Sequence, residues 1–316
     1  MDNNTPETQL LSQYNDEIDL RELFGVLWAG RIKIIAITAV FAIASVIYAL
    51  SMPNQFKATV LLSPAQSSSG GGLSGALGQL GGLASLAGVS LGGAGGSEGQ
   101  LAQEIMQSWS FIEGFIEDNN LAVGVYAADS WDRSSKKIEI NSDLYDVSKS
   151  QWLVEDGHTG VLGPPSSWTL FRAFSEILSV SEDTKSGLVE VSIEYYSPHL
   201  AKQWLDLYVA AINAHMQQRE MAKVTRNIEY LQIQIKKTSI AEMQEVFYTI
   251  IEEQIKNKML AEASPEFAFD SVSPSMVPEV KSQPKRALIC ILGALLGAIL
   301  SALVVLGSHY GRKSTT

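Results

Sequence analysis

Cysteine, charge and catalytic motifs are all scarce in this chain of 316 residues. Its single cysteine, Cys290, excludes a disulfide-stapled scaffold, which needs paired cysteines. Charged residues make up only 18% of the sequence, and the formal net charge is −11. This acidic balance argues against a nucleic-acid binder, because a negative surface repels phosphate. With 46% hydrophobic residues, the chain is also too apolar to be disordered.

Reactive side chains do not cluster in the way that an enzyme or a metal site requires. Four histidines occur, with no metal-ligand spacing between them: His158, His199, His215 and His309. The motifs of nucleotide-binding loops, zinc proteases, serine hydrolases and dithiol redox proteins do not occur. We therefore expect a protein that is not an enzyme and has no catalytic residue, metal or cofactor. Cys290 is expected to be a small apolar residue of a helix.

Two long runs, 34–56 and 287–311, contain no charged residue. About twenty helical residues cross a hydrocarbon core of ~30 Å. We predict transmembrane helices at 32–52 and 287–308, with two buried core helices as the alternative. Acidic residues before the first run, and the lack of a small-residue cleavage site after it, argue against a cleaved signal peptide.

Basic residues near the spans predict the topology. Five lie on the terminal side and four on the loop side: Arg21, Arg31, Lys33, Arg312 and Lys313, against Lys57, Lys281, Lys285 and Arg286. Because the flanks of the first helix usually dominate, we predict that residues 1–31 and 309–316 are cytoplasmic. The segment between the spans would then be periplasmic or extracellular. Residues 53–285 carry 17 basic and 28 acidic residues, so the whole net charge of −11 lies there.

The first part of the exported segment, 53–198, is predicted to be an α/β base domain. Strand-like runs and helical spacing alternate along it, with strands at 56–62, 176–182 and 188–195 and helices at 99–119 and from Ser166 or Ser167 to Phe174. Residues 183–187 are typical of a hairpin turn between the last two strands. A Gly/Leu-rich tract at 66–99 is expected to be a flexible linker. A loose helix or a contact between protomers is the alternative there, because leucines recur every three or four residues.

A long helical projection is predicted at 199–264, where no glycine or proline occurs. Apolar residues are spaced near 3.5, which is the coiled-coil repeat. Residues 236–239 are a plausible turn between two arms, and one continuous bent helix is the alternative. The following segment, 265–286, contains four prolines and is expected to be an extended strap that forms neither helix nor sheet.

Small residues form a ridge along the second predicted span. Gly293, Gly297 and Ser301 are spaced by four, which allows two helix backbones to approach closely. The partner could be the first span, a second protomer or another membrane protein. Coincidence is the alternative, because glycine and alanine are common in such helices.

Several short motifs resemble one known family. They are Glu17–Leu20 and Leu27-Trp28 before the first span, Pro53–Ala58 after it, Ser197–Ala201 at the start of the projection, and Pro278, Pro284–Arg286, Gly293 and Gly297 around the second span. In these motifs the chain resembles the polysaccharide co-polymerases, the Wzz chain-length determinants of Gram-negative inner membranes. The Gly/Leu-rich tract departs from that pattern.

The resemblance implies an α+β membrane protein with both termini cytoplasmic, a periplasmic α/β base and a long coiled-coil-like projection, assembled as a ring-like homo-oligomer. It implies non-catalytic control of the chain length of a lipid-linked glycan, usually the O-antigen of lipopolysaccharide, beside a Wzy-type polymerase. The candidate helix-association or polymerase contacts are Pro278, Pro284, Gly293, Gly297 and Ser301. A periplasmic adaptor or a co-polymerase subunit for capsule or exopolysaccharide export is the alternative.

Overall fold

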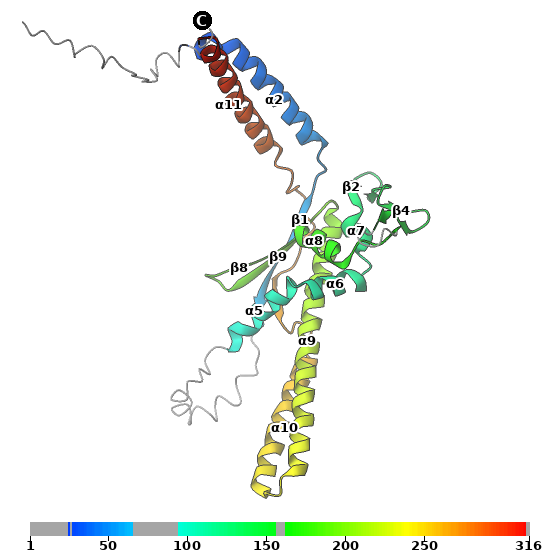
Figure 1. Ribbon diagram of the computed structural model, residues 1–316. Helices are drawn as coiled ribbons and strands as arrows, with labels where there is room; N and C mark the ends of the chain where they lie inside the picture. The colour runs from blue at the N-terminus through cyan, green and yellow to red at the C-terminus, as the bar shows by residue number, and fades with distance from the viewer. Residues whose placement is uncertain (1–24, 26, 66–93, 156–161, 314–316) are drawn as a thin grey trace, which may run out of the picture. The chain divides into compact units, whose positions relative to one another are not determined.

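The computed structural model describes residue 25 and residues 27–65, 94–155 and 162–313 (Figure 1). The chain divides into two compact units. The helix-pair unit comprises Met1–Met52 and Pro284–Thr316, and the base unit comprises Pro53–Gln283. Of the flexible linker predicted at 66–99, residues 66–93 lie outside the described residues. The prediction is wrong from Ala94 onward, because a helix begins there.

The helix-pair unit consists of two long helices that lie side by side, α2 (Arg31–Ser51) and α11 (Arg286–Lys313) (Figure 1). Both are long and apolar enough to cross a membrane. Only 6% of the most apolar stretch of α2 and 17% of that of α11 is buried. Core helices of a soluble fold would bury most of these residues, so the exposure favours the membrane interpretation over the alternative.

A four-stranded antiparallel sheet forms the centre of the base unit. Its strand order is β10-β1-β9-β8, with β1 at Phe56–Pro64, β8 at Leu178–Asp183, β9 at Leu188–Tyr195 and β10 at Phe269–Ser273. The predicted hairpin between β8 and β9 is confirmed, and its last turn residue, Gly187, has a φ of +68°. That backbone conformation strains most other residues.

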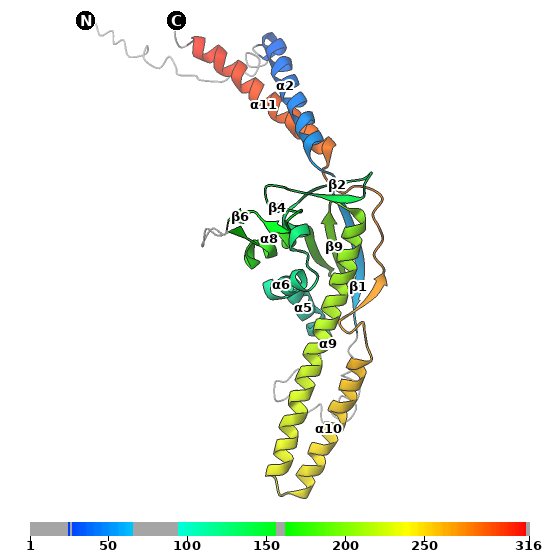
Figure 2. The same ribbon diagram turned by 90° about the vertical axis from the view of Figure 1, so that its right-hand side faces the viewer.

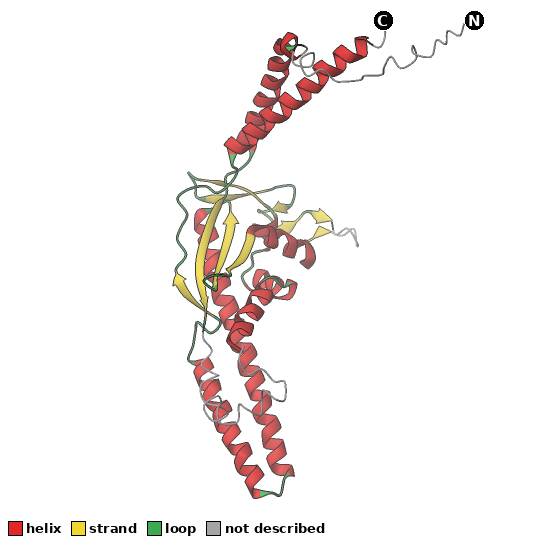
Figure 3. Cartoon of the chain, turned by 90° about the vertical axis from the view of Figure 1, so that its left-hand side faces the viewer, coloured by secondary structure: helices red, strands yellow, loops and turns green. Residues whose placement is uncertain are grey.

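Four helices cover one face of the sheet, as Figures 2 and 3 show. They are α5 (Ala94–Met106), α6 (Trp109–Asp118), α7 (Ala122–Tyr126) and α8 (Ser167–Ile177). The single helix predicted at 99–119 is divided, because the Ser108 hydroxyl accepts from the Phe111 amide and starts a new helix. Ser166 caps α8 in the same way, as predicted.

Three small hairpins complete this part of the fold, in a region where the sequence suggests no regular element. They pair β2 (Ala128–Asp132) with β3 (Lys137–Ile140), β4 (Tyr145–Asp146) with β5 (Gln151–Trp152), and β6 (Val154–Glu155) with β7 (Leu162–Gly163). In the second hairpin the Asp146 carboxylate accepts from the Ser148 hydroxyl and from the amides of Ser148 and Lys149. These hydrogen bonds lower the pKa of Asp146 to about 2.

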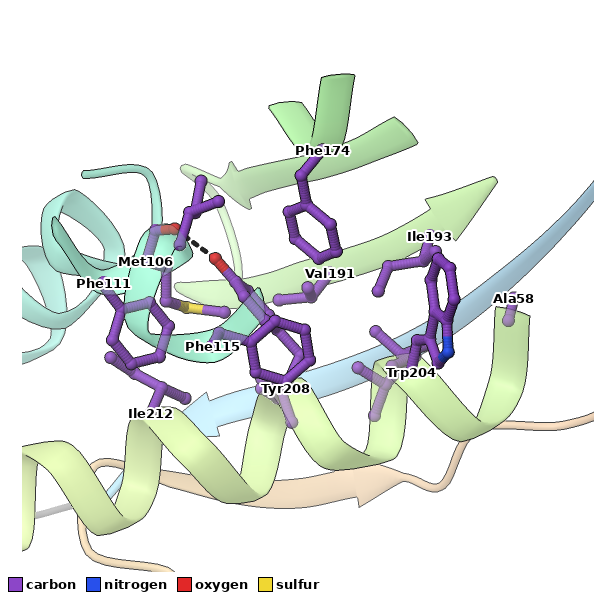
Figure 4. Packing of buried hydrophobic residues seen from close by; sticks show 14 of the residues in the cluster. Ala58, Met106, Phe111, Phe115, Phe174, Val191, Ile193, Trp204, Tyr208 and Ile212 are labelled. Carbon is purple, nitrogen blue, oxygen red and sulfur yellow. Dashed lines mark hydrogen bonds between the residues drawn. The ribbon is translucent and has the colours of Figure 1, made fainter. Parts of the chain in front are cut away.

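The helix α9 (Pro198–Lys237) belongs to the base core over its first half (Figure 4). Trp204, Tyr208 and Ile212 are buried against the sheet and the covering helices. The Tyr208 ring packs edge-on against Phe115, with ring centroids 4.8 Å apart. A helix that spans both the base and the projection ties the two together, so the predicted division at residue 198 does not separate two cores.

The second half of α9 pairs with α10 (Ala241–Glu262) and extends away from the sheet (Figure 2). The two-arm prediction is confirmed, because Thr238–Ile240 interrupts the helix. The 40 residues of α9 span about 60 Å. Glutamines satisfy the last carbonyls of each arm: Gln244 donates to Ile235 and Thr238, and Gln217 donates to Ala261 and Ser264.

The strap contains a strand, so the expectation that prolines keep 265–286 out of any sheet is wrong over Phe269–Ser273. This strand fits between Pro265 and Pro274 and pairs with β1. The buried Asn213 side chain of α9 holds it in place. Its oxygen accepts from the amides of Ala268 (2.8 Å) and Phe269 (2.9 Å), and its amide donates to the Phe269 carbonyl (3.1 Å).

Candidate functional site

The predicted small-residue ridge of α11 lies against α2. A Cβ atom added to Gly293 would come within 2.4 Å of the Cβ atom of Ser45. One added to Gly297 would come within 2.6 Å of the Cβ atom of Phe41. Any side chain at these two positions would therefore force the helices apart, because non-bonded carbons pack at ~3.5–4.0 Å. Of the three partners that the sequence leaves open, the first span is the one that the ridge contacts in this chain.

Ser301 continues the ridge by one turn and is fully buried. Its hydroxyl donates to the Ala298 carbonyl at 2.8 Å and lies 3.5 Å from the Thr38 hydroxyl of α2. The Ser45 hydroxyl likewise bonds within its own helix, to the Ala42 carbonyl. The seam between the helices is therefore narrow, and apart from Phe41 the residues named in it are small. Its two serine hydroxyls are hydrogen-bonded.

Outside this seam the two helices present large apolar side chains to their surroundings. The exposed residues on the two helices include Ile35, Val40, Ile43 and Ile47 of α2 and Ile291, Leu295, Leu303 and Val304 of α11. Such surfaces are stable in lipid and unfavourable in water. The outer faces are thus suited to apolar surroundings such as lipid.

The two proline candidates lie apart from the ridge in the sequence and in the fold. Pro278 is half-buried in the strap of the base unit. Pro284 is buried and belongs to the helix-pair unit, two residues before the start of α11. The ridge itself consists of Gly293, Gly297 and Ser301. The five candidate residues therefore do not form one site within either unit.

The chain enters and leaves the base unit at neighbouring positions. Gln55 and Gln283 form an antiparallel bridge, with the Gln55 amide 3.0 Å from the Gln283 carbonyl. The Ser282 amide donates to the Gln55 carbonyl at 2.9 Å, and its hydroxyl donates to the Glu194 carboxylate. Gln283 also donates to Glu194, at 3.3 Å. No sequence pattern marks this clasp, because Gln55 lies more than 200 residues along the chain from Ser282 and Gln283.

A pocket of about 340 Å³ lies between α9, β1 and the strap. Its main polar groups already bond to one another. Asp206 accepts from Lys202 at 2.5 Å and from the Ser275 hydroxyl, and Asn213 bonds the strap. The described residues contain no group of histidine, cysteine or acidic side chains that could hold a metal ion. These hydrogen bonds fasten the strap to α9.

The strongly perturbed phenols of the core are structural. Tyr208 donates to the Met106 carbonyl, and Tyr195 donates to the Gly124 carbonyl at 2.6 Å. Burial raises the pKa of both phenols, because the charged form would be desolvated. Both therefore stay protonated near neutral pH and act as hydrogen-bond donors in the core.

Comparison with known proteins agrees with the motifs of the sequence. The family model of the Wzz family, "Chain length determinant protein", matches residues 16–119, so the predicted resemblance to this family is confirmed. A full-length bacterial polysaccharide co-polymerase has a TM-score of 0.42 and 14% identity, with 93% of this chain and 99% of that chain covered. A fragment of WzzB, a polysaccharide co-polymerase from Salmonella Typhimurium, has a TM-score of 0.32 and 11% identity, with 73% and 100% covered. No curated protein sequence matches the chain.

Proposed function

We propose that this protein regulates the chain length of a lipid-linked polysaccharide without catalysing a reaction. We propose the O-antigen of lipopolysaccharide as this polysaccharide. The polymerising enzyme would be a separate membrane protein of the Wzy type. The observation that carries the proposal is the match of residues 16–119 to the chain-length determinant family. Polymer synthesis would be left to the partner, in keeping with a chain-length determinant.

The proposed location is a bacterial inner membrane, crossed twice, with both termini cytoplasmic and the base unit periplasmic. Two aromatic residues near the ends of the first span support insertion. Trp28 and Tyr48 are both exposed and lie twenty residues apart in the sequence, as expected for the two interfaces of a bilayer. The basic flanks of the first span support the orientation.

Assembly into a homo-oligomer is the proposed means of action. The α9–α10 arms present many apolar side chains to solvent, among them Tyr230, Ile233, Met243, Val246, Tyr248, Ile255 and Met259. A soluble monomer rarely exposes so many along one element, and such surfaces typically mark protein contacts. The assembled copies would hold the growing glycan near its polymerase, so the geometry of the assembly or the time spent there would set the length.

Deletion of the gene distinguishes this function from that of an adaptor for polysaccharide export. The length of the surface polymer is read from the band ladder of extracted lipopolysaccharide on a gel. A regulator predicts that polymer still reaches the surface but loses its modal length, and that the intact gene restores the mode. Loss of surface polymer altogether would instead favour an adaptor for capsule or exopolysaccharide export.

A further inference from the structure

We propose that the strap segment Met276–Lys281 lies in the lipid headgroup layer and binds anionic phospholipid through Lys281 and Lys285. The inference rests on the proposed membrane insertion of α2 and α11. It assigns a lipid-binding role to a part of the water-facing base unit, beyond the two spans themselves.

Two large apolar side chains of this segment are almost completely exposed. Met276 is 77% exposed and Val280 is 79% exposed, more than any other large apolar side chain of the base unit that the structure describes. A single exposed apolar residue needs no explanation. Two of them, four residues apart on a segment that leads directly into a predicted span, are suited to contact with a membrane surface.

The chain itself limits how far this segment can be from a bilayer. Val280 precedes the start of α11 at Arg286 by six residues, a reach of at most about 20 Å. Lys281 also donates to the Asn54 side chain at 3.4 Å, and Asn54 follows the end of α2 by three residues, a reach of about 10 Å. Both spans therefore tether the segment close to the polar layer of the bilayer. Tyr48, one turn before the end of α2, is 61% exposed, as expected for a residue at that layer.

The charge of the segment complements anionic headgroups. Residues 276–286 carry Lys281, Lys285 and Arg286 against the single acidic Glu279, although the exported part as a whole is strongly acidic. Lys281 is exposed and has no carboxylate partner among the described residues. Basic residues beside a span are attracted to anionic lipid within about a Debye length.

Electron paramagnetic resonance on the full-length protein in nanodiscs tests this directly. In a Cys290→Ala background, a nitroxide is attached to Val280→Cys, to Leu296→Cys in α11 or to Val272→Cys. Val272 is 54% exposed and lies on β10, beside Leu61 and Leu62 of β1. Leu61 and Leu62 follow Gln55 of the clasp by six and seven residues, so position 272 serves as the control farther from the spans. Accessibility to oxygen, which concentrates in lipid, is compared with accessibility to a water-soluble nickel chelate.

The expected order of the oxygen-to-nickel ratio is 296 highest, 280 intermediate and 272 lowest. Replacing phosphatidylglycerol by phosphatidylcholine, or combining Lys281→Gln with Lys285→Gln, should lower the ratio at 280 and leave it unchanged at 296. If position 280 is as aqueous as 272 while 296 is in lipid, the inference is wrong and the proposed insertion stands. A label at 280 that is shielded from both reagents would mean that protein covers it, which also refutes the inference. An aqueous signal at 296 would instead refute the proposed membrane insertion.

If the oxygen-to-nickel ratio at 280 changes neither with the lipid charge nor in the lysine variants, binding to anionic phospholipid is refuted.

Discussion

Replacing both glycines of the α11 ridge by leucine should separate the membrane helices and change the polymer length. The added Cβ atoms would lie 2.4 Å from Ser45 and 2.6 Å from Phe41 if nothing moved. Carbon atoms need ~3.5–4.0 Å, so the helices must part by about 1 Å before the rest of each leucine is accommodated. The Thr38–Ser301 contact, already at 3.5 Å, would then be lost. Close packing and such polar contacts contribute about 0.6–2 kcal/mol between membrane helices.

Disulfide crosslinking across the seam measures this separation. Thr38→Cys and Ser301→Cys are introduced together in a Cys290→Ala background, where their side chains replace two hydroxyls 3.5 Å apart. With the glycines intact, a mild oxidant should crosslink them rapidly. Gly293→Leu with Gly297→Leu should slow the reaction about tenfold, which corresponds to a loss of about 1.4 kcal/mol.

A matched control is present on the same helix. A Cβ atom added to Gly307 meets nothing within 4 Å, so Gly307→Leu should crosslink at the normal rate. In cells, the double leucine variant should insert normally and yet shift the polymer ladder, whereas Gly307→Leu should not. Fast crosslinking in the double leucine variant would refute the packing, and an unchanged ladder would show that the ridge has no role in chain length.

Three further predictions concern the base unit. Asn213→Leu leaves the Phe269 amide and carbonyl without their buried partner, so hydrogen exchange in β10 should accelerate by an amount equivalent to about 2 kcal/mol; unchanged exchange would contradict the role of this side chain. Gln217→Met removes the hydrogen bonds to the carbonyls at the end of α10, so hydrogen exchange there should accelerate by an amount equivalent to about 1 kcal/mol. The same change at the exposed neighbour, Gln218→Met, should have no effect. The pKa of Asp146 is lowered to about 2, so its support of the β4–β5 turn is complete above pH ~4 and is lost as the pH falls towards 2. Amide exchange at residues 148 and 149 should follow that window, and Asp146→Asn should abolish the pH dependence.

Local patterns in the sequence predict the elements whose stability is local. The apolar runs, the β8–β9 hairpin and the break between α9 and α10 follow from hydrophobicity, turn chemistry and capping within a few residues. The Ser108 cap shows the limit of this approach. Periodicity continues across it, and only the geometry of the capped helix shows that α5 and α6 are separate.

Long-range pairing could not be predicted. β10 is a five-residue strand between prolines, four of its residues are exposed, and its place beside β1 depends on Asn213 and the buried Phe269. The Gln55–Gln283 clasp likewise has no periodic signal. For the ridge, the spacing of Gly293 and Gly297 predicts a close contact but contains no information on the partner, because a small surface fits any helix.

The mass of the full-length protein in lipid nanodiscs tests the central claim, which is that this protein acts as an assembly of several chains. Single-particle mass measurement, corrected for lipid and scaffold, gives the number of chains in each particle. The account predicts several chains of 34.3 kDa in one particle. Particles that contain a single chain across the range of protein concentrations would contradict it.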